Sequence, residues 1–127
     1  MELPYFRRKV VAVDFDGVIH RHQTPFLNPT EIPDPPVEGA IDFLLAVWEH
    51  YEIVIFSARA NDPDAVAAIR EWLGKYWPAE RQHVLDEVYI TARKVQAVIY
   101  IDDKGFHFRG TFPTIDEIKN FRSWCKV

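Results

Sequence analysis

The sequence has one cysteine, Cys125, among its 127 residues, so no disulfide can form within the chain. It has no apolar run long enough for a membrane-spanning helix, and its first residues are polar and basic, so we expect no signal peptide. The formal net charge is −4, which argues against a generally basic surface for nucleic acid. These absences predict a cytoplasmic protein in a reducing compartment, with no membrane partner.

What the chain does contain is typical of one folded globular domain. Hydrophobic residues make up 48% of the sequence and charged residues 27%, which is an ordinary globular composition. No repeat, low-complexity tract or linker interrupts it. We therefore expect one domain that spans residues 1–127.

Apolar patterning predicts alternating strands and helices. Four short apolar runs indicate buried strands, at Lys9–Asp14, Ile53–Phe56, Val88–Thr91 and Ala97–Ile101. Helical spacing and helix-start signals indicate helices over Val37–His50, from Pro63 to Tyr76, and from Thr114 to about Trp124. This alternation predicts an α/β fold with a central parallel sheet.

Polar residues of catalytic type stand where the predicted strands end. Asp14, Ser57 and the pair Asp102-Asp103 each close a strand, and Lys94 follows the remaining strand closely. In parallel α/β sheets, ligands bind beyond the carboxyl ends of the strands. The sequence therefore predicts a site at this edge of the sheet.

The segment Asp14-Phe15-Asp16-Gly17-Val18 offers two carboxylates at a strand end. Asp14 can attack phosphorus as a nucleophile, and Asp16 can protonate the leaving oxygen and later deprotonate water. Gly17 permits a tight turn after them. The alternative is an Asp-Gly turn that ends a strand without chemistry.

The pair Asp102-Asp103 indicates a cation site. Adjacent acids repel one another unless a cation or a donor compensates them, and Mg²⁺ prefers oxygen ligands of this kind. Magnesium would also shield the negative charge of a phosphate and so let an anionic nucleophile approach it. Taken alone, the segment Asp102–Gly105 would be a simple turn.

Four more residues are candidates for binding a phosphoryl group. The hydroxyl of Ser57 and the backbone N–H of Ala58 could hold a phosphoryl oxygen, and Lys94 could offset its charge. Arg59 could pair with a phosphate through two hydrogen bonds, or could lie at the surface or at a helix entry. Lys94 could likewise be an ordinary surface lysine.

The proline-rich stretch Phe15–Pro36 lacks periodicity and is predicted to be a long ordered loop, of which Ile19–Pro36 could cover the site; such loops are usually functional. His20 and His22 lie at its start. They could touch the substrate or the leaving group, but solvated histidines are the more common outcome in a polar loop. The loop, or a second subunit, could cover the site.

These segments together resemble the haloacid dehalogenase superfamily in its phosphatase branch. Asp14–Val18 looks like its first motif, Phe56-Ser57 its second, Lys94 its third and Ile101–Asp103 its fourth, in the same order. Val18 stands where many members have threonine. The resemblance covers nearly the whole chain from Val10 to about Phe112.

The resemblance implies a three-layer Rossmann-like fold and a role for each motif residue. Asp14 would form an aspartyl-phosphate, and Asp16 would act as acid and base. Ser57 and Lys94 would bind the transferred phosphoryl group. Mg²⁺ would be held by Asp14, by the backbone carbonyl of Asp16 and directly by Asp102, and Asp103 would ligate it through water or orient the site.

The intervals between the motifs are too short for an inserted cap domain, so a capless, open site is expected. A Mg²⁺-dependent phosphohydrolase is the function predicted, with a phosphoryl-transfer enzyme or a non-catalytic phospho-ligand-binding module as alternatives. The substrate stays open among a nucleotide, a sugar phosphate, a nucleic-acid end and a phosphoprotein.

Overall fold

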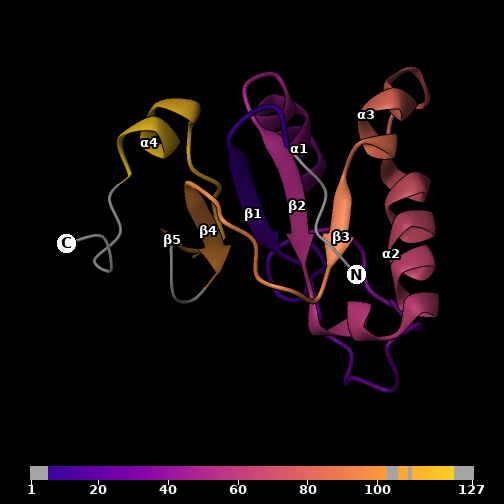
Figure 1. Ribbon diagram of the computed structural model, residues 1–127. Coiled ribbons are helices and arrows are strands. Elements are labelled where there is room, and N and C mark those ends of the chain that lie inside the picture. Colours follow the sequence, from indigo (N-terminus) through magenta and orange to yellow (C-terminus); the bar gives the residue numbers. More distant parts are fainter. Residues whose placement is uncertain (1–5, 103–105, 109, 122–127) are drawn as a thin grey trace.

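A computed structural model describes residues 6–102, 106–108 and 110–121 of the chain. The strands are β1 (Val10–Asp14), β2 (Glu52–Phe56), β3 (Tyr89–Thr91), β4 (Ile99–Asp102) and β5 (Phe106–His107) (Figure 1). The helices are α1 (Ala40–Trp48), α2 (Pro63–Tyr76), α3 (Gln82–Asp86) and α4 (Ile115–Asn120), with 3₁₀ turns η1 (Ala58–Asn61) and η2 (Ala79–Arg81). Asp103, Cys125 and the predicted helix end near Trp124 lie outside the described residues.

Two helices begin at the caps that the sequence predicts. Asp62 accepts a hydrogen bond from the backbone N–H of Asp64 at 2.9 Å, and Pro63 occupies the first turn of α2. At α4, Thr114 accepts from the N–H of Glu117 while the Glu117 carboxylate accepts from the N–H of Thr114. This reciprocal pair confirms the capping box.

The first helix starts later than its apolar spacing suggests. Gly39 has a φ of 84°, a left-handed conformation that other residues resist, so α1 begins at Ala40 rather than at Val37. The short elements η2, α3 and β5 were not predicted, because each is too brief to show a period. Within the described residues, no helix is long and apolar enough to cross a membrane.

The five strands form one parallel sheet in the order β3-β2-β1-β4-β5. Val13 of β1 lies opposite Ile55 on one side and Ile101 on the other. The carboxyl ends of the three central strands therefore meet at the same edge. This arrangement confirms the predicted α/β class with a central parallel sheet.

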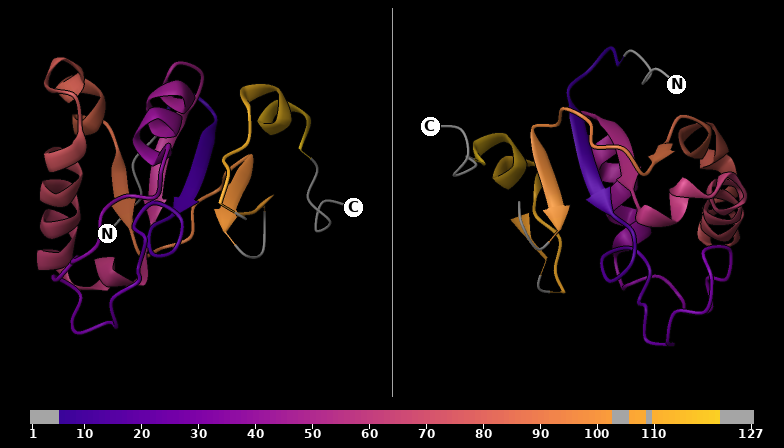
Figure 2. Two further views of the ribbon diagram at one scale, coloured as in Figure 1. Left: turned by 180° about the vertical axis from the view of Figure 1, so that it is seen from behind. Right: turned by 60° about the horizontal axis from the view of Figure 1, so that its bottom comes forward.

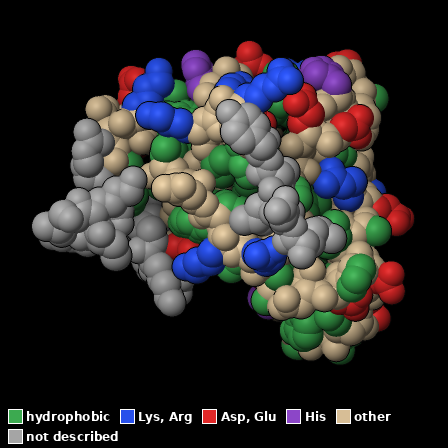
Figure 3. All heavy atoms as spheres, in the orientation of Figure 1, with side chains coloured by type: hydrophobic (Ala, Val, Ile, Leu, Met, Phe, Trp, Pro, Cys, Tyr) green, Lys and Arg blue, Asp and Glu red, His purple; other side chains and the backbone are tan. Residues whose placement is uncertain are grey.

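The helices pack on only one face of that sheet, as the two views in Figure 2 show. Alternate strand residues, such as Val11 and Ile53, pack there against buried residues of all four α-helices. The opposite face, with Ala12 and Val54, is covered by strand and loop residues, and no described helix contributes to it. Hydrophobic side chains reach the surface in the middle of this face, between lysine and arginine side chains (Figure 3).

The expected three-layer arrangement is therefore not found in the described part of the chain. A right-handed crossover from β3 to β4 must pass over the face opposite α1 and α2. Residues 92–98 make that crossover as an extended segment, and they are too few to form a helix with its turns. The third layer is reduced to this segment and residues near the N-terminus, such as Phe6.

The loop from Phe15 to Pro36 lies beyond the carboxyl ends of the strands (Figure 1). It is ordered by internal hydrogen bonds, as predicted. The Asp34 carboxylate accepts from the backbone N–H groups of Gln23 and Thr24 and from the Thr24 hydroxyl, each at 2.7 Å. The backbone carbonyl of Asp34 accepts from the Trp72 indole at 3.0 Å, which ties the loop to α2.

Candidate active site

Three of the predicted acidic residues line one cavity at the carboxyl edge of the sheet. Asp14 at the end of β1, Asp16 just after it and Asp102 at the end of β4 surround a space of about 260 Å³. The other described residues around it are Gly17, Val18 and Phe108. The parallel register of β1 and β4 brings these carboxylates together, although Asp102 is far from the others in sequence.

The turn after β1 sets the direction of the first two carboxylates. Phe15 is fully buried, and its carbonyl accepts from the N–H groups of Ile19 and His20, both at 2.9 Å. Gly17 takes a φ of 84° in this turn, with open space where a Cβ would be. The Phe15 N–H donates to Oδ1 of Asp14 at 2.9 Å. The half-buried Asp14 is thereby held at the cavity.

Asp16 is engaged on both carboxylate oxygens. Its Oδ2 accepts from Nε of Arg59 at 2.8 Å, and its Oδ1 lies 2.8 Å from Nδ1 of His20. Burial by itself raises the pKa of Asp16, but the hydrogen bonds from Arg59 and His20 outweigh it and hold that pKa below the ordinary 3.8. The resting carboxylate is therefore ionised at neutral pH.

His20 is fully buried, so the expectation of a solvated side chain is wrong for this residue. Its Nε2 accepts from the N–H of Asp34 at 3.1 Å, which places the ring proton on Nδ1 and makes Nδ1 the donor to Asp16. The ring stacks on Phe15 with centroids 5.5 Å apart and meets the edge of Trp72. His20 is thus a packed link between Asp16 and the loop.

His22 lies nearer to solvent, with its Nδ1 3.5 Å from Oδ1 of Asp16 and a φ of 54°. Ligand atoms of Asp16, His20 and His22 all lie within 4.8 Å of one another, close enough to hold a metal ion. The tautomer of His20 argues against this use, because its Nδ1 carries a proton while Nε2 accepts from Asp34. A metal on Nδ1 would require that hydrogen bond to break.

Arg59 occupies a different place from the one expected of a phosphate ligand. Its buried guanidinium pairs with Asp16, and its Nη1 donates to the carbonyls of Asn28, Pro29 and Glu31 at 3.0–3.2 Å. The guanidinium also lies over the Phe26 ring, 4.9 Å from its centroid. These contacts make Arg59 the clamp between the loop and Asp16.

The described residues that line the cavity include none of the remaining phosphoryl-binding candidates, which are Ser57, Ala58 and Lys94. The buried Ser57 uses its hydroxyl to accept from the N–H of Arg59 at 3.2 Å, so it caps η1, where the exposed Ala58 follows. The exposed Lys94 sits on the crossover, with its ammonium 5.4 Å from the centroid of the Tyr100 ring. The structure therefore brings together Asp14, Asp16 and Asp102.

Phe108 lines the cavity, and the sequence gives no signal for it. It follows β5, a strand of two residues that periodicity could not reveal. Asp34 was missed because it lies among prolines in a segment without a pattern. Only its hydrogen bonds to the loop and to His20 make its role visible.

The fold and the site together define a parallel α/β protein with a carboxylate-lined cavity at the strand ends. No protein-family model, curated protein or solved structure matches the chain.

Proposed function

We propose that this protein is a magnesium-dependent phosphomonoesterase, organised like a capless member of the haloacid dehalogenase superfamily, with Asp14 as the nucleophile. The observation that supports this most is the single cavity shared by the carboxylates of Asp14, Asp16 and Asp102. These are the acids to which the resemblance assigns the chemistry. Their position at the carboxyl edge is where such sheets bind ligands.

The donor set of this cavity suits Mg²⁺, which prefers carboxylate and carbonyl oxygens. Asp14 and Asp102 would hold the ion through their side chains. Asp16 would contribute its backbone carbonyl, because both of its carboxylate oxygens already accept hydrogen bonds. When bound, Mg²⁺ would neutralise charge on the phosphoryl oxygens.

The reaction would then proceed in two steps on Asp14. A carboxylate oxygen of Asp14 attacks phosphorus, and the bond from phosphorus to the leaving oxygen breaks with its electron pair on that oxygen, which takes up a proton from solvent. Water next attacks the aspartyl-phosphate, which releases inorganic phosphate and restores Asp14. An ionised Asp16 suits the second step, in which it takes a proton from water.

One observation favours a second candidate, a non-catalytic module that binds a phosphorylated ligand. Arg59 and His20 hold both oxygens of Asp16, so Asp16 could serve only to fix the loop. Such a module would bind phosphate together with Mg²⁺ and release no product. Turnover separates the two candidates.

The first test is hydrolysis of p-nitrophenyl phosphate with and without Mg²⁺. We expect activity that requires Mg²⁺, disappears with excess EDTA and returns when Mg²⁺ is restored. Full activity in EDTA would contradict the metal-assisted mechanism. Binding of phosphate without any turnover would favour the non-catalytic module.

The second test is Asp14→Asn, which removes the nucleophile but keeps the size of the side chain. We expect a loss of activity of about 10³-fold or more, as when a covalent nucleophile is deleted. Asp64→Asn, an exposed acid in the first turn of α2, is the matched control and should keep full activity. Circular dichroism of both variants checks the fold. Normal turnover by a folded Asp14→Asn variant would exclude Asp14 as the nucleophile.

A further inference from the structure

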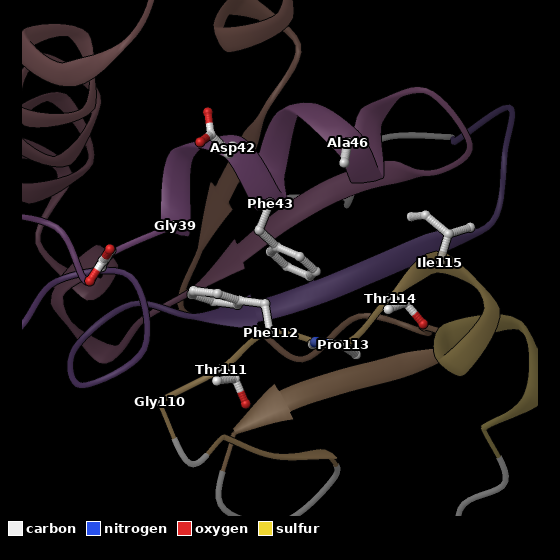
Figure 4. A pocket seen from close by; sticks show the side chains of 11 residues that line it. Gly39, Asp42, Phe43, Ala46, Gly110, Thr111, Phe112, Pro113, Thr114 and Ile115 are labelled. Atoms are coloured by element: carbon white, nitrogen blue, oxygen red, sulfur yellow. The ribbon is translucent and has the colours of Figure 1, made fainter.

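A second, larger cavity lies beside the proposed active site, between α1 and the segment that leads into α4 (Figure 4). It is an open groove of about 520 Å³. Figure 4 shows the rings of Phe43, from α1, and Phe112, from the opposite wall, pointing toward each other. These two rings stack with centroids 4.7 Å apart, and most of the groove surface is apolar.

Both walls of the groove continue from the walls of the carboxylate cavity. On one side, Phe108 lines the cavity and its ring contacts Phe112 of the groove, with centroids 4.6 Å apart. On the other side, Val18 lines the cavity, and the neighbouring Ile19 accepts from the N–H of Val37, which directly precedes the groove residue Glu38. The groove therefore adjoins the cavity at the contact between Phe108 and Phe112.

The charge of the groove restricts what can lie in it. Two exposed carboxylates, those of Glu38 and Asp42, belong to its lining, and none of its described lining residues is a lysine or an arginine. A second phosphate or a nucleic-acid backbone would be repelled by these two carboxylates. An apolar group, above all one with an amine at its far end, matches both the aromatic walls and the acids.

We propose that this groove binds the leaving group of the substrate, and that the substrate is a small aryl phosphate. Its aromatic part carries no negative charge, and a cationic group at the far end of that part strengthens binding to the groove. This inference rests on the proposed phosphatase function. It goes beyond the substrate classes named from the sequence, and it disfavours nucleic-acid ends and sugars with a second phosphate.

Three aryl phosphates that differ in the charge at the far end of the ring test the charge preference: phenyl phosphate, tyramine phosphate with its amine, and 3-(4-phosphooxyphenyl)propionate with its carboxylate. We expect kcat/KM to fall in the order tyramine phosphate, phenyl phosphate, propionate, with about tenfold between the first and the last. In Asp42→Lys, which places a cation beside Glu38, this preference should be lost. Asp64→Lys makes the same change in the first turn of α2, away from the groove, and should leave the order unchanged. Equal kcat/KM values for the three substrates in the wild type would overturn the charge preference.

A bulky side chain placed in the groove tests whether the substrate occupies it. Ala46 is an exposed groove residue of α1, so Ala46→Phe should fill the space while the helix persists. We expect KM for the aryl phosphates to rise about tenfold. Acetyl phosphate, whose acetyl group is too short to leave the cavity, should react as before. Ala67→Phe, at an exposed position of α2, is the control. Unchanged aryl kinetics in Ala46→Phe would overturn the proposal.

The two proposals fail in different ways. If acetyl phosphate is hydrolysed but the aryl series shows no preference, the groove proposal alone is wrong. If no phosphate ester is hydrolysed, the phosphatase function is wrong, and titration with tyramine by NMR still tests the groove. Shifts confined to groove residues, and lost in Ala46→Phe, would support a binding site for apolar cations. An absence of shifts would overturn it.

Discussion

Asp16 differs from Asp14 in what its carboxylate oxygens contact. The buried guanidinium of Arg59 and the buried ring of His20 both donate to it, and they keep its pKa low. A carboxylate that is ionised at rest is ready to accept a proton from water, but it has no proton to give to a leaving group. The resting site therefore fits the base role of Asp16 more directly than its acid role.

Asp16→Asn tests this asymmetry. The loss of the base should slow hydrolysis of the aspartyl-phosphate by about 10²-fold or more, so the phosphorylated enzyme should accumulate. With p-nitrophenyl phosphate, which needs little acid assistance, we expect a burst of nitrophenol close to the enzyme concentration and then a slow steady rate. Rapid-quench kinetics measure both phases. A slow reaction without a burst, in a variant that circular dichroism shows to be folded, would mean that Asp16 does not act in the second step.

At the scale of elements, the loop 15–36 is held by two side chains that come from different parts of the chain. Arg59, on η1, reaches three loop carbonyls and Asp16. Asp34, within the loop, fixes the opposite side of the loop at Gln23 and Thr24. Together they keep the loop at the carboxyl edge of the sheet, next to the cavity.

Removal of Arg59 should release the loop. Arg59→Ala breaks a largely buried ion pair and leaves Asp16 without its main donor, which should lower the free energy of unfolding by about 3 kcal/mol. Arg81→Ala, which breaks the more exposed pair with Glu49, should cost less than about 1 kcal/mol. Urea unfolding measures both values, and limited proteolysis should cut the loop only in Arg59→Ala. Equal stability of the two variants would contradict the role of Arg59 as a clamp.

The hydrogen bonds to Asp34, the second side chain that holds the loop, predict how the free energy of unfolding depends on pH. The largest effect on the pKa of Asp34 is the hydrogen bond from the backbone N–H of Thr24, and the next largest is the one from the Thr24 hydroxyl. These hydrogen bonds outweigh burial, which acts in the opposite direction, and lower the pKa of Asp34 from its ordinary 3.8. Because the folded protein binds this proton more weakly than the unfolded chain, the stabilisation is complete above pH 3.8 and is lost as pH falls through the folded pKa.

In Asp34→Asn, the free energy of unfolding should therefore fall less steeply as the pH is lowered into the acidic range. Thr24→Val keeps the backbone donors, so its pH dependence should change less. Urea unfolding between neutral and acidic pH provides the comparison. If the free energy of unfolding falls as steeply at acidic pH in Asp34→Asn as in the wild type, Asp34 does not contribute to this pH dependence.

At the scale of the whole molecule, the sheet carries helices on one face and an extended crossover on the other. The cavity lies at the edge of this sheet, where β1 and β4 end side by side, so the site depends on the alignment of strands that are far apart in sequence. Asp16 is paired with Arg59 and His20, so the carboxylates of Asp14 and Asp102 are the ones that a cation would link across β1 and β4. A cation that binds them should therefore stabilise the whole fold.

Binding of Mg²⁺ should raise the thermal midpoint by several degrees. At a concentration of 100 times its dissociation constant, a ligand of the folded state adds about 2.7 kcal/mol to the free energy of unfolding. Asp102→Asn should remove most of this shift, whereas Asp116→Asn, in the first turn of α4, should keep it. Calorimetry in MgCl₂ and in NaCl of equal ionic strength measures the effect. A shift of the same size in Asp102→Asn would show that the ion binds elsewhere.

Much of the fold could be predicted from the sequence because it depends on interactions between residues that are close in the chain. The apolar runs of β1 and β2 indicated buried strands because parallel sheets are covered on both faces. Asp62 before Pro63, and Thr114 three residues before Glu117, marked helix starts because caps act within one turn. Asp14, Asp16 and Asp102 could be expected at one edge because parallel strands end on the same side.

The tertiary structure alone decided which side chains those acids contact. Arg59 lies 43 residues from Asp16, and no local pattern links them, so the expectation of a phosphate ligand gave way to an ion pair. His20 became buried because Phe15 and Trp72 enclose its ring, and the N–H of Asp34 then fixed its tautomer. The sequence determined where the strands end and which acids stand there; long-range packing determined that Asp16 is held ionised and that an apolar groove adjoins the site.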